Sequence, residues 1–139
     1  AHQAIERRWW AVRGGGAFRN GRRLDRVVAA DWGRAVVAVS GRPPLDADWW
    51  QYRTLGAGAI DLCLVADGSV DAFIDMSPSA HGIWDYAGAW LVCHEVGVEV
   101  VDAQGRDLFV RDHSMRRTPV AAPGENLPRA LAVRRRLPL

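Results

Sequence analysis

Helix-like and strand-like hydrophobic patterns alternate along this chain, with glycine or proline between them. In residues 56–66, four apolar positions recur at the helical spacing i, i+3, i+4 and i+7: Ala59, Leu62, Cys63 and Ala66. Gly68 follows as a helix stop, and residues 70–76 then alternate as a strand does. A chain with this alternation folds into layers, with helices packed on a sheet.

Further elements follow from the same signals. Asn20-Gly21 between two short apolar segments is a strong hairpin signal, which predicts at least one antiparallel pair. We expect helices at 46–52, 56–66, 83–96 and 124–135. Strands or short apolar runs are expected at 9–13, 35–40, 70–76, 98–101 and 119–122. The predicted class is therefore α/β, in the mixed α+β sense, with a mixed sheet flanked by helices.

Composition and charge narrow the classes of protein. The 139 residues are 49% hydrophobic and 24% charged, which fits one globular domain and excludes a disordered or collagen-like chain. No apolar run approaches the roughly 20 residues of a membrane helix. All 18 basic residues are Arg, but the only dense run is at 134–136 and the net charge is +2. A nucleic-acid binder is thus the weakest alternative, and we expect neither a nucleic-acid nor a membrane partner.

The two cysteines allow one disulfide or none. Cys63 and Cys93 both lie in apolar periodic segments, so buried free thiols are expected rather than a disulfide. Free thiols fit a reducing compartment, and no leader is visible at the start of the sequence, which together predict a cytoplasmic protein. No Cys or His spacing suggests zinc.

Two segments contain candidate functional residues. Asp85, in WDYAG, stands at the start of a predicted helix. Either it caps that helix, or it is a rigidly held carboxylate that binds a hard cation such as Mg²⁺. Gly56, Ala57 and Gly58 precede the earlier helix, where small residues permit either close helix packing or open backbone N–H groups for a polar ligand.

Together these segments resemble the C-terminal half of the inositol monophosphatase family. The matching segments run in the family's order: WAVRGGGAFRNG (10–21), GAGAIDL (56–62), DAF (71–73), WDYAG (84–88), EVG (95–97), VDAQG (101–105) and RTPVAA (117–122). The resemblance implies a layered α-β-α-β-α sugar-phosphatase fold. It also implies a phosphomonoesterase that uses Mg²⁺ ions to activate water and neutralise phosphate.

The resemblance assigns roles to individual residues. Asp85 would be a metal ligand and a substrate contact, and Gly56, Ala57 and Gly58 would form the substrate-facing turn. Asp75 stands where the family often has a Glu that binds a substrate hydroxyl. Because the stretch from Asp75 to Asp85 is longer than in the family pattern, His81 and the loop 77–82 receive no role. No catalytic residue is assigned to this half.

The family's first half, with most of its metal ligands, has no counterpart in these residues. We therefore expect residues 1–139 to be the C-terminal subdomain of a phosphatase, inactive alone and partnered by the missing N-terminal half of the same protein. The expected substrate is a small phosphorylated metabolite such as inositol phosphate, and the expected assembly is a homodimer. The alternative is a truncated, non-catalytic relative that acts as an oligomeric interaction module through its exposed apolar face.

Overall fold

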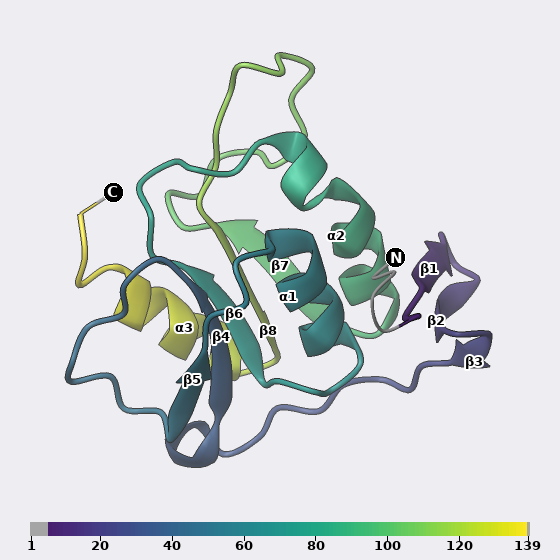
Figure 1. Cartoon of the computed structure of the whole chain (residues 1–139), viewed down its shortest axis with the longest axis horizontal. Coiled ribbons are helices and arrows are strands. Elements are labelled where there is room, and N and C mark those ends of the chain that lie inside the picture. The colour runs from purple at the N-terminus through teal and green to yellow at the C-terminus, as the bar shows by residue number, and fades with distance from the viewer. Residues whose placement is uncertain (1–5, 139) are drawn as a thin grey trace.

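The computed structural model describes residues 6–138, which fold into four layers (Figure 1). Helix α3 covers one face of a five-stranded sheet, α1 and α2 cover the other face, and a three-stranded sheet packs on the far side of α2. This confirms the expected mixed α/β class. The helices are α1 (Gly58–Ala66), α2 (Ala87–Glu95) and α3 (Asn126–Arg134), with 3₁₀ turns η2 (Trp32–Arg34) and η3 (Ile83–Asp85). The strands are β1 (Trp9–Val12), β2 (Gly16–Arg19), β3 (Arg22–Arg23), β4 (Val36–Ser40), β5 (Gln51–Arg53), β6 (Ala72–Asp75), β7 (Val98–Asp102) and β8 (Pro119–Pro123).

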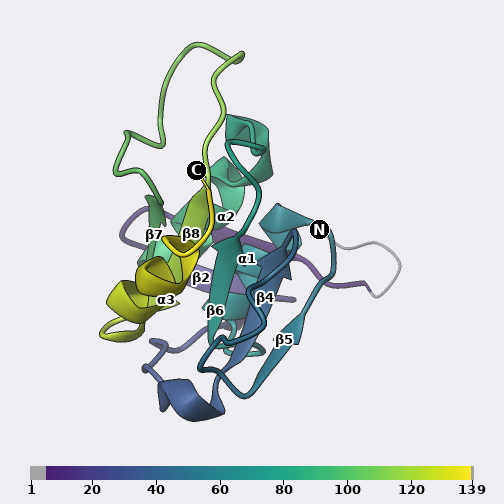
Figure 2. The same cartoon turned by 90° about the vertical axis from the view of Figure 1, so that its left-hand side faces the viewer.

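The five-stranded sheet is mixed and has the order β5-β4-β6-β8-β7. Strand β4 runs parallel to β5 and β6, whereas β8 is antiparallel to β6 and β7. Its central strands are apolar on both faces because helices cover both (Figure 2). In β4, Val37 and Val39 pack toward α3, while Ala38 packs toward α1 and α2. The period of two in the strand therefore divides the core into two clusters.

The predicted hairpin is confirmed as β2 and β3. Asn20 and Gly21 have φ of +50° and +81°, the left-handed values that a tight Asn-Gly turn requires. Two carboxylates hold this small sheet against the helices. Glu95 of α2 accepts hydrogen bonds from the N–H groups of Gly14 (2.8 Å) and Gly16 (2.9 Å). Asp67, which follows α1, bonds the Trp9 Nε1 and Arg19 Nη1 atoms, both at 2.9 Å.

The helix expected at 46–52 is wrong. That segment forms turns and then enters β5, whose pairing begins where the N–H groups of Trp50 and Gln51 both donate to the Ala35 carbonyl. Within the same segment, Asp48 accepts a hydrogen bond from Trp32 Nε1 at 3.0 Å. Pairing with β4 and this tertiary contact outweigh a weak local helix preference.

The helix expected at 83–96 is two elements. Turn η3 ends at Asp85 and α2 begins at Ala87, because Tyr86 between them leaves helical geometry, with φ of −138°. The Tyr86 side chain is buried, and its hydroxyl donates to the Leu108 carbonyl at 2.6 Å. The remaining expected helices and strands are present within a few residues, and Cys63 and Cys93 are free and buried as predicted. No helix in residues 6–138 is long and apolar enough to cross a membrane.

Candidate functional site

Three segments meet where α1 begins: the glycine-containing turn 56–58, the loop 77–82 and the Trp-Asp segment. The loop after β6 brings His81 there, and η3 brings Asp85. The two meet at Gly58, the first residue of α1. A Cβ placed on Gly58 would lie 3.0 Å from His81 Nε2 and 3.6 Å from the Asp85 carbonyl oxygen. A side chain at position 58 would crowd the His81 ring, and the absence of one permits this close approach between the glycine-containing turn and the Trp-Asp segment.

Asp85 keeps one carboxylate oxygen available. The residue is half-buried, and its Oδ2 accepts a hydrogen bond from the Gly82 N–H at 3.0 Å. Its Oδ1 accepts no hydrogen bond from any group in residues 6–138. Asp85 thus closes the η3 turn and does not cap α2, as the cap interpretation required, because α2 starts only after Tyr86. A carboxylate that is fixed by one oxygen and open at the other suits a cation ligand.

The described residues supply only part of a metal site. Across residues 6–138, no group of three or more His, Cys, Asp or Glu side chains is arranged to hold a metal ion. Mg²⁺ in proteins is held by one or two carboxylates together with water and substrate phosphate. Asp85 fits one such position, and these residues alone do not assemble a metal centre.

The glycine-containing turn exposes the start of α1. Gly56 has φ of +76°, a conformation that favours glycine, and the Ala57 carbonyl accepts the N–H groups of Ile60 and Asp61. Neither α1 nor α2 has a side-chain cap among the described residues. Because both helices begin beside Gly58 and Asp85, their uncapped N–H groups and helix dipoles favour an anion here.

Asp75 is placed differently from the role that the resemblance implied. Its carboxylate is fully buried at the end of β6. Oδ1 accepts the Ser77 N–H at 2.9 Å, and Oδ2 pairs with His81 Nδ1 at 2.8 Å. Both oxygens are engaged within the chain, so the group exposed toward the site is His81.

His81 is held among carboxylates. Burial opposes its charged form, but the hydrogen bond to Asp75 and the charges of Asp75, Asp85 and Asp61 outweigh burial and raise the pKa of His81 above its ordinary value. The imidazole therefore keeps its proton to a higher pH than an exposed histidine.

Asp61 was not singled out from the sequence. It lies in the first turn of α1, is fully buried, and neither carboxylate oxygen has a hydrogen-bond partner among residues 6–138. Burial raises the pKa of Asp61 to about 6, against the smaller lowering effects of the nearby Ala57 backbone and of His81. The available signal was a single acidic residue inside an otherwise apolar helix.

Trp84 and a long loop border the site. Trp84, next to Asp85, is 59% exposed, and the Arg116 guanidinium lies 4.9 Å from its ring centroid. Arg116 belongs to the segment between β7 and β8 that projects from the body of the fold (Figure 1). At the base of this segment, Asp102 bonds Arg106 at 2.7 Å. An aromatic and a cationic side chain are therefore stacked at the residue that precedes Asp85.

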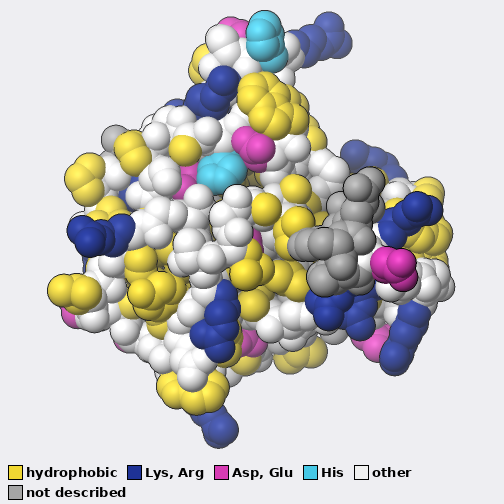
Figure 3. All heavy atoms as spheres, viewed as in Figure 1, with side chains coloured by type: hydrophobic (Ala, Val, Ile, Leu, Met, Phe, Trp, Pro, Cys, Tyr) yellow, Lys and Arg dark blue, Asp and Glu magenta, His cyan; other side chains and the backbone are white. Residues whose placement is uncertain are grey.

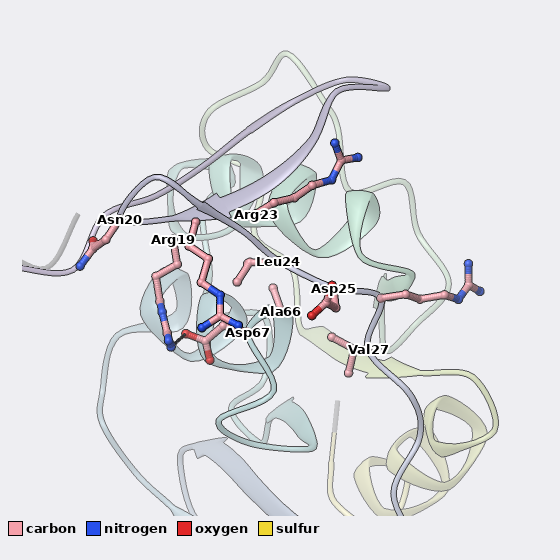
Figure 4. Close-up of a pocket in the computed structure, with 10 residues that line it drawn as sticks. Arg19, Asn20, Arg23, Leu24, Asp25, Val27, Ala66 and Asp67 are labelled. Carbon is pink, nitrogen blue, oxygen red and sulfur yellow. Dashed lines mark hydrogen bonds and ion pairs between the residues drawn. The ribbon is translucent and has the colours of Figure 1, made fainter.

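A hollow of about 470 Å³ lies at the opposite end of α1, under the hairpin (Figure 4). Four arginines line it: Arg19, Arg22, Arg23 and Arg26. Arg19 is paired with Asp67 at 2.9 Å, and the Arg23 side chain extends away from the hollow. The Arg19–Asp67 pair joins the hairpin to the end of α1, so this hollow is separate from the site at Gly58.

The comparison with known proteins decides the family. The model of the inositol monophosphatase family matches residues 1–138. The chain belongs to the inositol monophosphatase family. Relatives include an inositol-1-monophosphatase of Mesorhizobium japonicum, 32% identical, with 92% of this chain matching 50% of that protein. A histidinol-phosphatase of Mycobacterium tuberculosis is 31% identical over 73% of this chain and 44% of its own length.

Solved structures of inositol monophosphatase relatives share the fold. A protein of Pyrococcus horikoshii described as similar to inositol-1 monophosphatase superposes with a TM-score of 0.81 and 24% identity, over 94% of this chain and 53% of that chain. An inositol monophosphatase–fructose 1,6-bisphosphatase superposes with a TM-score of 0.79 and 25% identity, over 94% and 54% of the two chains. The present chain thus spans about half the length of the relatives it matches.

Proposed function

We propose that this chain is part of a Mg²⁺-dependent phosphomonoesterase that hydrolyses a small phosphorylated alcohol such as inositol phosphate. The observation that carries the proposal is the free Oδ1 of Asp85 beside the uncapped starts of α1 and α2. A phosphate and a cation would both find partners at this place. Family membership and relatives named as phosphatases support the same activity.

Different residues of this chain would bind the substrate and the metal ion. The backbone N–H groups at the start of α1, with Gly56, Ala57 and Gly58, would receive the substrate, while Asp85 would supply one metal ligand and a substrate contact. Mg²⁺ in such a site activates water and neutralises phosphate charge. Its other protein ligands would come from polypeptide outside residues 6–138, because these residues contain no cluster that could supply them.

Phosphate release tests this function. We expect the intact protein, expressed from its own gene, to release phosphate from myo-inositol 1-phosphate when Mg²⁺ is present. EDTA should abolish the activity and excess Mg²⁺ should restore it, whereas residues 1–139 alone should be inactive. Phosphate release that is insensitive to EDTA, or the absence of release from every small phosphomonoester tried, would contradict the proposal.

The missing N-terminal half is the partner that we propose for the face formed by β1, α1 and α2. An apolar groove of about 480 Å³ lies there, lined in part by Trp9, Trp10, Ile60 and Leu91. On the face seen in Figure 1, hydrophobic side chains gather over α1 (Figure 3). The groove and the length of the relatives support a covering segment of the same protein, with homodimerisation as a further step.

Mass measurement separates this partner from the alternative, an oligomeric and non-catalytic interaction module. For the enzyme, we expect a denatured mass well above the 15.3 kDa of this chain, or a second chain in the native particle. A denatured mass of 15.3 kDa with a native mass at a multiple of it would favour the module. A stable native monomer of 15.3 kDa would contradict both assemblies.

We also propose a cytoplasmic location. Cys63 and Cys93 are free, and both are buried. Burial raises the pKa of the Cys63 thiol to about 12, so it stays protonated and unreactive. Unpaired thiols fit a reducing compartment.

A further inference from the structure

A substrate bound at this site would present its carbon skeleton and hydroxyl groups to the side chains around Gly58. A carboxylate at position 75 would need a free oxygen for that contact. Asp75 has none, because Ser77 and His81 engage its two oxygens at 2.9 and 2.8 Å, and its side chain is fully buried. Because the carboxylate is fully buried, a substrate hydroxyl could reach Asp75 only if His81 or the other groups that cover it moved aside.

The His81 ring is rigidly oriented. Its backbone pairs with Arg117 in both directions, with N–H to carbonyl distances of 3.1 and 2.8 Å. The ring packs edge-on against Phe73, and Asp75 fixes its Nδ1 atom. These contacts fix the orientation of the imidazole ring, so that its Nε2 atom faces Gly58.

The Nε2 atom has no hydrogen-bond partner in the described part of the chain. It faces the glycine turn and lies close to the point where Gly58 approaches the Asp85 carbonyl. The buried carboxylate of Asp61, whose charge acts on His81, also lacks a hydrogen-bond partner among residues 6–138. Buried polar groups are normally paired in folded proteins, so the unpartnered Asp61 carboxylate close to the open Nε2 of His81 indicates a site built for a ligand.

We propose that His81 Nε2 is the substrate-contacting group of this site, and that Asp75 acts only as the positioning residue that orients the imidazole. This inference rests on the proposed phosphatase function. It makes His81 the specificity-determining residue for the hydroxyl beside the phosphate of the substrate.

The chemistry of imidazole suits a hydroxyl in both protonation states. With Nδ1–H donated to Asp75, neutral His81 offers the Nε2 lone pair to a hydroxyl proton. The imidazolium instead donates its Nε2–H to the hydroxyl oxygen. A carboxylate can only accept a hydrogen bond from the hydroxyl, whereas His81 can either accept one from it or donate one to it.

Two isosteric substitutions separate a substrate contact from a structural role. Asparagine places its amide near Nδ1 and can keep the bond to Asp75, whereas glutamine places its amide near Nε2. We expect His81→Asn to raise the KM for myo-inositol 1-phosphate about tenfold with little change in kcat, as loss of one hydrogen bond predicts. His81→Gln should stay closer to wild type. Gly58→Ala, whose Cβ would crowd Nε2, should raise the same KM with His81 intact.

The matched control is a substrate that lacks the hydroxyl. The KM for p-nitrophenyl phosphate should change by less than about twofold in His81→Asn, because a single substrate hydrogen bond is removed and not the fold. If His81→Asn matches wild type while His81→Gln is impaired, His81 only holds Asp75 and the inference is overturned. Equal loss on both substrates together with a lower melting temperature would overturn it as well.

Failure of the phosphatase function itself is recognised separately. In that case wild-type protein releases phosphate from neither substrate. The inference is then judged by the imidazole nitrogen NMR signals of His81 during titration with myo-inositol 1-phosphate. The His81 Nε2 signal is assigned by its absence from His81→Gln; in wild type, a saturable shift of that signal supports the contact, and an unchanged signal rejects it.

Discussion

Replacing Asp85 by asparagine should lower kcat/KM for phosphate release on the order of 1,000-fold, because a metal ligand worth several kcal/mol of charge stabilisation is lost. Asparagine has nearly the same shape, and its amide oxygen can still accept the Gly82 N–H that Asp85 Oδ2 accepts at 3.0 Å. The η3 turn should therefore persist, with a melting temperature close to that of wild type. Steady-state kinetics over a Mg²⁺ series, alongside thermal unfolding, measure the two effects.

The matched control for this substitution is Asp46→Asn. The Asp46 side chain is 83% exposed, and within residues 6–138 its one ion pair is a 3.6 Å contact with Arg136 at the surface. We expect this control to leave kcat/KM and stability unchanged. If Asp85→Asn kept more than about a tenth of the activity at saturating Mg²⁺, Asp85 would not be a metal ligand. If it unfolded the protein, the carboxylate would be structural.

The second large effect is a pH-dependent gain in stability from Asp61→Asn. Asp61 is fully buried without hydrogen-bond partners in residues 6–138, and burial raises its pKa from 3.8 to about 6. A shift of about two units corresponds to roughly 3 kcal/mol against the ionised form in the folded state. Asparagine is neutral at every pH, so at pH 8 we expect the variant to be more stable than wild type by up to about 3 kcal/mol.

The direction of this pH dependence follows from the number of protons that the folded and unfolded states bind. Between pH 4 and pH 6 the folded protein holds a proton on Asp61 that the unfolded chain has released, so wild-type stability falls as pH rises. Below pH 4 both states approach full protonation, and the advantage of asparagine should nearly vanish. The raised pKa of His81 acts in the same direction, since stability that depends on its proton is lost as pH rises through that pKa.

Urea unfolding at pH 4 and pH 8 tests this expectation. The quantity of interest is the variant's stability minus that of wild type at each pH, because the slope of wild type alone also contains His81. Asp46→Asn serves again as the exposed control and should show no difference at either pH. An equal gain in stability at both pH values would assign the effect of Asp61→Asn to packing. A loss of stability at pH 8 would contradict the predicted effect of removing the buried charge.

Local signals predicted the elements whose geometry depends on near neighbours. Asn20-Gly21 predicted its hairpin because only a few residue types tolerate positive φ at both turn positions. The helical spacing of Leu62, Cys63 and Ala66 predicted α1, because one face of that helix must be apolar to pack. The resemblance of ordered motifs then identified the family correctly.

The errors arose where a distant contact decided the local conformation. The helix expected at 46–52 was lost to pairing with β4 and to the Trp32–Asp48 hydrogen bond, which joins residues 16 positions apart. The helix expected from residue 83 was interrupted because Tyr86 is drawn into the core toward Leu108. Neither contact leaves a periodic signature in the segment that it reshapes.

By itself, the sequence determined the alternation of helices and strands, the hairpin and the family, because each depends on residue type at short spacing. Only the tertiary structure decided how the carboxylates are used. It engaged Asp75 with His81, left one oxygen of Asp85 free and buried Asp61 unpaired. Hydrogen bonding and burial are properties of atoms brought together by packing, and residues far apart in sequence set them jointly.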